Sequence, residues 1–581
     1  MPLDMKHTIL KIASAAGCAM LAVSCMNFSP EEQLSDSQVW SRADNFMLFA
    51  DEFYEWTRDF RGSTSVTYMN GLSDGPHADT RSDLLCEASV NNYSAGNNSI
   101  PSTDENYKQL YKRIYYVNLL LQKAADFEPQ ADIAEPMGEA YFFRAYLYFE
   151  LVQMFGDCIY TAEPVDVDSE ILYGPRTNRV TVIRNCIADL KAAVELLPDS
   201  PSADGRVCDY TAWSLISRIG LYEGTWQKFH DGDAAASAEF LTDAAEAAKE
   251  VMDSDQYELF YSDALGGRDS YRYMFVLEDV QCNPAGLTKS SNSEYIFARR
   301  HDETLKPIGL NITHGCLNNA YRPTYKLASM YRCQDGLPIS ISPLFMGENG
   351  ENTDFDNRDN RMNGTMMMNG QRNWNNDGEW RISWDEEDEA DDRCMIADRR
   401  VNSGFANYKW ATERQVADES EGYDYPIIRY AEVLLNYAEA VFELNGSITD
   451  EQLDASLNLV RHRSNPEMTA LSNDLVNTNG LDMREEIRVE RTVELFLEGF
   501  RIDDLKRWKT AEDEMPGDLL GIKYTGTWYE TNWTDMPNQT NSDGYIILYT
   551  GRTWNERNYL LPLPSDELQL NPELGQNPGW E

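Results

Sequence analysis

Apolar residues recur every three or four positions along several stretches of the chain, and this period of about 3.6 residues predicts α-helices. In the first half the predicted helices form neighbouring pairs, at residues 107–125 with 139–155 and at residues 180–197 with 210–229, followed by a helix at 236–252. The helix at 139–155 has apolar side chains on nearly all sides, so we expect it to be buried between its neighbours. Gly156 follows its last apolar residue, as a left-handed helix cap requires.

Helical spacing returns in the second half, where Tyr430 begins a stripe that advances by steps of four and three. Asn445-Gly446 predicts the end of that helix. Thr449 with Gln452 is typical of a capping box that opens the next helix. Asp482 with Glu485 repeats this pattern before a helix that we expect to run unbroken through Trp508.

Helix pairs of about 34 residues, with small residues where neighbours touch, indicate stacking of the tetratricopeptide type. Two other stretches, 261–425 and 511–581, are irregular and contain only short strand-like pieces such as 545–549. Long loops of this kind are usually functional or disordered. We therefore predict a mainly α fold, with a tetratricopeptide-like helix-pair core, long loop-rich insertions and a few short strands.

The amino-acid composition argues against one class of partner and suggests another. The chain has 50 basic and 97 acidic residues and a formal charge of −47, so its mean field repels nucleic acid, and we expect no nucleic-acid partner. The 42% of hydrophobic residues suffice for a large core, while 32 Tyr, 21 Phe and 13 Trp suggest additional surfaces that grip a ligand.

The first 24 residues have the pattern of a signal peptide. Lys6 and Lys11 precede an uncharged run at 12–23, which is shorter than the roughly 20 apolar residues of a membrane span. A small residue directly before Cys25 is typical of a bacterial lipobox, which predicts cleavage at that point and acylation of the Cys25 thiol. The alternative is an ordinary secretory signal that happens to contain a cysteine.

The eight cysteines after Cys25 are widely scattered, with no close-spaced pair that would indicate zinc or redox chemistry. We expect most of these thiols to be buried as small apolar groups.

Several sequence runs resemble one family, SusD/RagB. Residues 426–440, PIIRYAEVLLNYAEA, are similar to its RYAEVLL-YAEA motif, and residues 488–508 resemble its ERR-EL-EG-R helix. The tail from Leu561 through Trp580 is similar to the PIP-E-NP-QNPGY ending, with Trp580 where Tyr is usual. Residues 144–146 and 155–157 match the first helical repeat. The runs stand in family order, so the resemblance covers essentially the whole chain.

The resemblance implies a lipid-anchored, surface-exposed protein of the outer membrane that binds an oligosaccharide, performs no catalysis and uses no cofactor. It also implies a partner, a TonB-dependent barrel of the SusC type whose mouth the protein covers like a lid. We expect a signal peptide at 1–24, an N-terminal helical region at 25–260, a loop-rich ligand side at 261–425, C-terminal helical repeats at 426–510 and a family-specific terminal segment at 511–581.

A glycan site needs aromatic platforms beside amide and charged groups, because sugar rings combine flat C–H faces with rims of hydroxyls. Members of the family place ligand residues in the stretch corresponding to 68–100. The family's other aromatic platform tends to lie in the stretch corresponding to 301–321. For any individual residue here, an ordinary loop hydrogen bond is the simpler explanation, because Asn and Asp favour turns regardless of function. The candidates in these stretches are Arg81, Asp83, Asn92, Tyr93, Asn98, Asn311 and His314.

The insertion at 363–384 is not a family motif, and it supplies Trp374, Trp380 and Trp384 as further ligand candidates. Three indoles in a loop rich in Asn and Gly are difficult to bury in a core, and exposed aromatic groups often mark a binding surface. The alternative is that they fasten the insertion to the body of the protein.

Other function classes fit less well. A glycoside hydrolase would need two of the 97 acidic residues, and no sequence motif marks a pair. The acidic run 385–392 and Asp354-Phe355-Asp356 lack the remaining positions of a calcium loop, so no metal is expected. The charged residues of 484–501 are expected to form structural bridges at three- and four-residue spacing. A peptide or other nutrient as ligand, and a purely structural surface role, remain alternatives.

Overall fold

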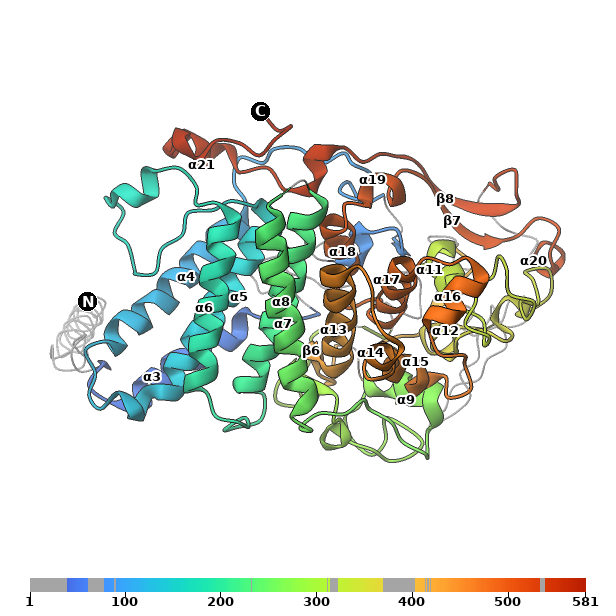
Figure 1. The fold of residues 1–581 in the computed structure, drawn as a ribbon, viewed down its shortest axis with the longest axis horizontal. Coiled ribbons are helices and arrows are strands. Elements are labelled where there is room, and N and C mark those ends of the chain that lie inside the picture. The colour runs from blue at the N-terminus through green and yellow to red at the C-terminus, as the bar shows by residue number, and fades with distance from the viewer. Residues whose placement is uncertain are drawn as a thin grey trace, which may run out of the picture.

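The computed structural model describes residues 39–60, 78–87, 90–230, 232–310, 312–313, 322–368, 403–412, 414, 417, 419–532 and 539–581. Long helices stand side by side in one part of the molecule, and shorter helices, loops and short strands make up the other (Figure 1). The helices of the first half are α3 (Ala43–Asp51), α4 (Glu105–Ala124), α5 (Ala134–Phe155), α6 (Arg179–Leu196), α7 (Asp209–Phe229) and α8 (Ala234–Asp253). The predicted helix pairs are confirmed.

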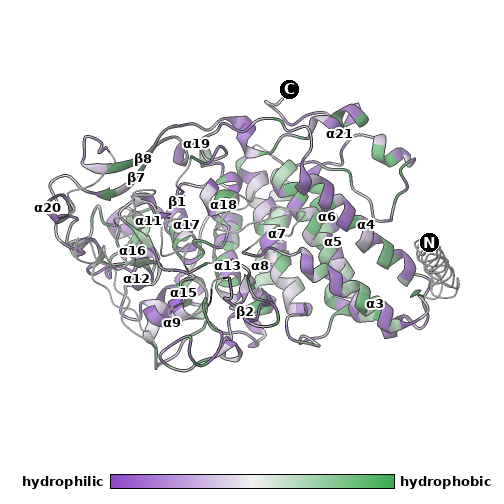
Figure 2. Ribbon diagram, turned by 180° about the vertical axis from the view of Figure 1, so that it is seen from behind, coloured by the Kyte–Doolittle hydropathy of each residue, from purple (hydrophilic) through white to green (hydrophobic). Residues whose placement is uncertain are grey.

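Each of these helices packs on the next in chain order from α4 to α8, and α8 then packs on α13 (Tyr430–Asn445). The stack is close because small residues lie at the contacts. A Cβ atom at Gly220 would stand 2.6 Å from the Phe240 carbonyl oxygen of α8. Helix α5 is buried on nearly all sides, as its pattern predicted. The fold is therefore mainly α with a helix-pair core, and hydrophobic residues concentrate in these helices (Figure 2).

The second half contains shorter helices: α9 (Gly266–Met274), α11 (Tyr325–Met330), α12 (Asn360–Thr365), α14 (Asp450–Asp454), α15 (Leu457–Ser464), α16 (Asn473–Asn479), α17 (Met483–Glu494), α18 (Arg501–Arg507), α19 (Ala511–Glu514), α20 (Trp528–Asn532) and α21 (Ser565–Leu570). The predicted end of α13 and the predicted start of α14 are confirmed. Gly446 ends α13 at a φ of 69°, and Thr449 and Gln452 form the expected capping box of α14.

The prediction of one unbroken helix through Trp508 is wrong. Helix α17 ends at Glu494 and α18 begins at Arg501, because Leu497 and Gly499 between them adopt positive φ angles of 63° and 79°. The Trp410 indole donates a 3.1 Å hydrogen bond to the Leu497 carbonyl oxygen, which holds the break in place from a segment 87 residues away.

The described strands form four separate antiparallel pairs. They join β1 (Leu85–Cys86) to β3 (Arg322–Pro323), β2 (Tyr295–Arg299) to β6 (Tyr425–Arg429), β4 (Met366–Met367) to β5 (Ala406–Asn407), and β7 (Gly517–Lys523) to β8 (Tyr545–Arg552). Strand β6 runs directly into α13, so the β2–β6 pair ties the loop-rich side to the helical stack.

Buried ion pairs join segments of the second half that lie far apart in the sequence. The Arg429 Nη1 donates 2.7 Å hydrogen bonds to both Glu294 and Glu494, and its Nε donates to Glu498 at 2.8 Å. The charged residues of 484–501 are thus structural, as expected, but the expected spacing is wrong for most of them. Arg488 pairs with Glu485 three positions away, whereas Glu490 and Glu494 find partners 29 to 133 positions away.

Six cysteines lie within the described residues, and all six are buried and free, as expected: Cys86, Cys158, Cys186, Cys208, Cys282 and Cys333. None of the described helices is long and apolar enough to cross a bilayer.

Candidate functional site

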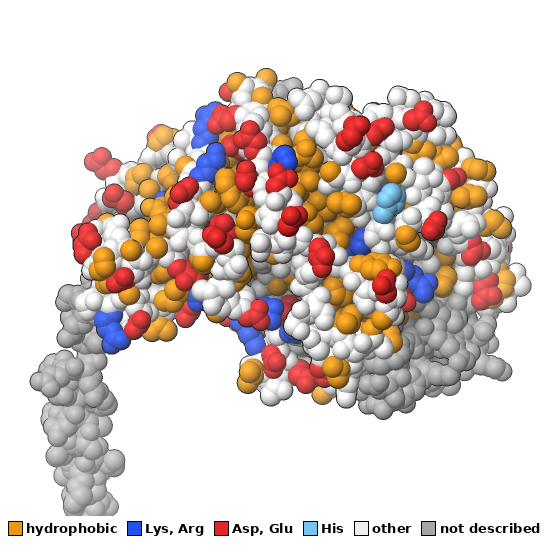
Figure 3. Space-filling view, turned by 60° about the horizontal axis from the view of Figure 1, so that its bottom comes forward, with side chains coloured by type: hydrophobic (Ala, Val, Ile, Leu, Met, Phe, Trp, Pro, Cys, Tyr) orange, Lys and Arg blue, Asp and Glu red, His pale blue; other side chains and the backbone are white. Residues whose placement is uncertain are grey.

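A cavity of about 530 Å³ opens on the loop-rich side, and we call it the polar cavity. Its volume lies in the ~300–1,000 Å³ range of small-molecule sites. Figure 3 shows the lower face of the molecule, where acidic and basic side chains are mixed. The lining residues are Pro201, Asp204, Gly205, Arg206, Met274, Leu277, Glu278, Thr288, Lys289, Ser290, Asn292, Tyr295, Ile296, Phe297, Ala298, Arg300 and Asp424.

Ion pairs hold the charged wall of the polar cavity. The Lys289 ammonium donates to the Gly422 carbonyl oxygen at 2.6 Å and to the Asp424 carboxylate at 2.8 Å. Arg300 bridges Asp424 at 3.0 Å and Asp204 at 2.8 Å. Because these charges are already paired, the wall is fixed before any ligand arrives, and little ordering entropy is lost on binding.

Uncharged polar groups lie beside this wall. The Asn292 side-chain oxygen accepts a 3.0 Å hydrogen bond from the Glu294 backbone, which orients the amide, and within the described residues its NH₂ group donates to no partner. The hydroxyls of Thr288 and Ser290 lie 2.9 Å apart. Apolar side chains, Phe297 among them, complete the lining. Amide and hydroxyl groups over an apolar floor suit a ligand with hydroxyls on an otherwise apolar ring.

Asp83 and Tyr93 are engaged inside the protein. The Asp83 carboxylate accepts two hydrogen bonds from Arg501, of 2.9 and 2.7 Å, and is buried. The Tyr93 hydroxyl donates to the Asn558 carbonyl oxygen at 3.1 Å, and the Arg81 guanidinium lies 5.1 Å from the centre of the Tyr93 ring. These contacts bind the 78–98 segment to the C-terminal part of the chain.

Asn92 is exposed, whereas Asn98 is half-buried and accepts a 2.8 Å hydrogen bond from the Asn558 amide. Neither lines the polar cavity. A ligand role for Arg81, Asp83, Asn92, Tyr93 or Asn98 stays a prediction. The remaining candidates, Cys25, Asn311, His314, Trp374, Trp380 and Trp384, lie outside the described residues.

Sequence reasoning missed the residues of the polar cavity. Its lining does fall largely within 261–425, the predicted ligand side. The available signal was the polar run 288–293, TKSSNS, directly before the apolar strand β2. Tertiary packing alone brings the segment 201–206 and the residue Asp424 next to this run.

No group of His, Cys, Asp and Glu side chains in the described part of the chain could hold a metal ion. Asp354, the first residue of the calcium-like run, is buried in the protein interior. Burial raises the pKa of Asp354 to about 7, against the attraction of nearby Arg358. A carboxyl in this setting is a poor start for a calcium loop, which needs ionised and accessible oxygens.

Two family models match the chain. Residues 287–580 match the model described as the SusD family, and residues 61–221 match the model described as starch-binding associating with outer membrane. The first match contains all of the polar-cavity residues from the 288–300 segment, together with Asp424.

Curated relatives and solved structures agree with these models. The chain is 24% identical to SusD-like protein P2 of Formosa agariphila over 502 residues, covering 84% of this chain and 83% of the relative. A SusD-like carbohydrate binding protein from Bacteroides fragilis has a TM-score of 0.72 at 22% identity, covering 92% of this chain and all of that one. A SusD homolog from Bacteroides thetaiotaomicron has a TM-score of 0.62 at 17% identity, covering 95% and 100%.

Proposed function

The chain belongs to the SusD family, and from this premise we propose that it is a surface lipoprotein that captures a glycan and hands it to a SusC-type TonB-dependent transporter in the outer membrane. The polar cavity is the proposed capture site. The acylated Cys25 is the proposed anchor, and the loop-rich side at 261–425 is the proposed ligand side.

The observation that carries this proposal is the composition of the polar cavity. The Asn292 amide and the Thr288 and Ser290 hydroxyls lie beside an apolar floor, within walls already fixed by ion pairs. Sugar rings offer matching surfaces, since their hydroxyl rims accept and donate hydrogen bonds while their C–H faces pack on apolar side chains.

Binding without hydrolysis is part of the proposal. Each carboxylate of the polar cavity already forms an ion pair: Glu278 with Arg414, Asp424 with Lys289, and Asp204 with Arg300. A glycoside hydrolase needs one carboxyl group free to donate a proton to the leaving oxygen and a second one opposite it. The paired carboxylates support capture rather than cleavage.

The test is titration of the purified mature chain with neutral oligosaccharides and with peptides, followed by product analysis of the same samples. We expect an oligosaccharide to bind and to be recovered intact. Asn292→Ala should weaken binding about tenfold, because the loss of a hydrogen bond in the cavity costs about 1 kcal/mol or slightly more.

Arg300→Ala should also weaken binding, while Arg184→Ala, which removes a comparably exposed arginine paired with Glu239 on the helical side, should leave it unchanged. Shortened products would indicate an enzyme. A peptide that binds where all sugars fail would replace the glycan as ligand, and equal affinity of all variants would move the site away from the polar cavity.

A further inference from the structure

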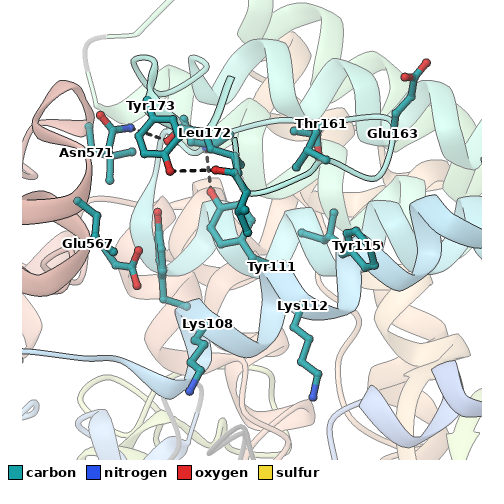
Figure 4. A pocket seen from close by; sticks show the side chains of 17 residues that line it. Lys108, Tyr111, Lys112, Tyr115, Thr161, Glu163, Leu172, Tyr173, Glu567 and Asn571 are labelled. Atoms are coloured by element: carbon teal, nitrogen blue, oxygen red, sulfur yellow. Dashed lines mark hydrogen bonds between the residues drawn. The ribbon is translucent and has the colours of Figure 1, made fainter. Parts of the chain in front are cut away.

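A second pocket lies on the helical side, between α4, the loop 159–174 and the C-terminal segment that contains α21 (Figure 4). We call it the tyrosine pocket. Its volume is about 440 Å³, which is again within the ~300–1,000 Å³ range of small-molecule sites. It shares no lining residue with the polar cavity. Four tyrosines, Tyr107, Tyr111, Tyr115 and Tyr173, form much of its lining together with Leu172, Val167 and Leu570.

Hydrogen bonds fix the walls of the tyrosine pocket. The Asn571 amide donates to the carbonyl oxygens of Leu172 at 3.0 Å and Gly174 at 2.9 Å, which ties the loop to the C-terminal segment. The Tyr111 hydroxyl accepts from the Ile159 backbone at 2.9 Å, and the Tyr173 hydroxyl donates to the Val167 carbonyl oxygen at 2.9 Å. The pocket is therefore formed in the free protein.

The rim is unusually apolar for a surface. Val167 is 77% exposed, Leu570 is 70% exposed and Tyr173 is 51% exposed. Isolated exposed apolar side chains are common, but a group of them around a concave site marks a place where something binds. The concavity favours a small ligand or a ligand branch over a flat partner surface.

The chemistry of the lining limits the ligand. Because the hydroxyls of Tyr111 and Tyr173 are engaged within the protein, these tyrosines offer ring faces rather than polar groups. Glu567 points toward the cavity in Figure 4, and burial, followed by repulsion from Asp566, raises the pKa of its carboxyl. Lys108 and Lys112 balance Glu163 and Glu567 in formal charge, so the pocket does not favour an ionic ligand.

We propose that the tyrosine pocket is a second carbohydrate site, which takes neutral sugar units carrying a methyl or acyl substituent, such as 6-deoxy or N-acetyl sugars. The sugar face packs on the tyrosine rings, the substituent contacts the aliphatic rim, and ring hydroxyls reach Glu567. This site goes beyond the capture site proposed above, because it lies in a different part of the chain and selects a different feature of the glycan.

The test is saturation-transfer NMR on the full mature chain, with methyl α-fucoside, N-acetylglucosamine and glucose as probes. We expect the strongest saturation at the C6 methyl and the acetyl methyl protons. The affinity for glucose should be about tenfold weaker, because one apolar group in a hydrophobic pocket is worth roughly that factor. Tyr173→Ala and Leu570→Ser should each reduce the methyl signals severalfold.

Both substitutions are at exposed side chains, so the fold should persist, and the melting curve checks that it does. The control is Asn292→Ala in the polar cavity, which should leave these signals unchanged. If Asn292→Ala loses glycan capture but keeps the methyl signals, the change is confined to the polar cavity. If Tyr173→Ala keeps glycan capture but loses the methyl signals, the change is confined to the tyrosine pocket. Either result separates the two proposals.

Equal saturation of all three sugars, or methyl signals that survive Tyr173→Ala and Leu570→Ser, would overturn the second site. A third result would also overturn it: none of the sugars binds, and the same two variants weaken a complex with a purified partner protein. The occupant of the pocket would then be an apolar side chain of that protein.

Discussion

The guanidinium of Arg501 holds the carboxylate of Asp83 through two hydrogen bonds, of 2.9 and 2.7 Å, although the two residues stand 418 positions apart. Both side chains are buried. The pair joins the segment before β1 to the start of α18, next to the break between α17 and α18. The pair gives Asp83 a structural role, and its ligand role stays a prediction.

Asp83→Ala should therefore destabilise the protein. Removing one partner of a buried ion pair leaves the other charge uncompensated and costs about 3–5 kcal/mol. Chemical denaturation measures the free energy of unfolding. Asp253→Ala, which removes a partner of the exposed pair with Lys249, is the control and should change little. A stable Asp83→Ala variant that no longer bound glycan would instead support the ligand role.

The Glu439 carboxylate makes stability depend on acid pH. Burial is the largest single effect and would raise its pKa, but the attraction and hydrogen bonds of Arg507, the attraction of Arg491 and the hydrogen bond from Trp508 together outweigh burial and lower the pKa of Glu439 from 4.5 to about 2. A depressed pKa in the folded state stabilises the protein above the unfolded pKa, and this contribution is lost as the pH falls from about 4.5 to about 2.

Glu439→Gln should accordingly cost about 3 kcal/mol at neutral pH and should flatten the loss of stability between pH 5 and pH 2. Urea denaturation at several pH values measures both effects. Glu239→Gln is the matched control, because Glu239 pairs with Arg184 at the surface, where water screens the interaction. Parallel pH profiles for wild type and Glu439→Gln would contradict the assignment.

The break between α17 and α18 depends on Gly499, whose φ is 79°. Gly499→Ala should destabilise the protein by about 1 kcal/mol or more, because side chains with a Cβ atom disfavour that conformation. Gly174→Ala is the control, since Gly174 has a φ of −88° and its added methyl would meet nothing closer than 3.7 Å. Equal melting temperatures for both variants would show that the break tolerates a Cβ atom.

This break also shows what the sequence could and could not predict. Local sequence patterns predict the features that neighbouring residues determine, such as the capping box of Thr449 and the end of α13 at Gly446. The residues 495–500 look helical by themselves, and the hydrogen bond that holds their turn comes from Trp410. A partner so distant leaves no local pattern.

The candidate site likewise depends on contacts between segments that are far apart in the sequence. The sequence predicts a ligand side within 261–425, where most of the polar-cavity lining lies, but it does not single out Asn292. The cavity arises because the 201–206 turn and Asp424 pack against the loop before β2. Likewise, Arg429 belongs to a recognisable family motif, yet its role as a buried hub for Glu294, Glu494 and Glu498 appears only when the three carboxylates are brought together.

The buried thiols should resist modification in the native protein. Burial raises the pKa of Cys158 to about 12, and it also raises the pKa of Cys86 and Cys186. Only the thiolate reacts with maleimide at an appreciable rate. Mass spectrometry after labelling at pH 8 should find these positions unmodified in the folded protein and modified after denaturation. Rapid labelling of Cys158 in the native state would contradict the packing around α4 and α5.

The proposed lipid anchor at Cys25 can be tested by labelling. If Cys25 carries lipid, metabolic labelling with a palmitate analogue should mark the wild-type protein, and the label should remain with the membrane fraction. Cys25→Ser should lose the label and release the chain from the membrane, because the acylated thiol is the proposed anchor. Cys18→Ser is the matched control, since Cys18 lies within the predicted signal peptide and should be dispensable. Unchanged labelling in Cys25→Ser would move the lipid to another residue, and a wild-type chain without label would leave an ordinary secretory signal as the explanation of residues 1–24.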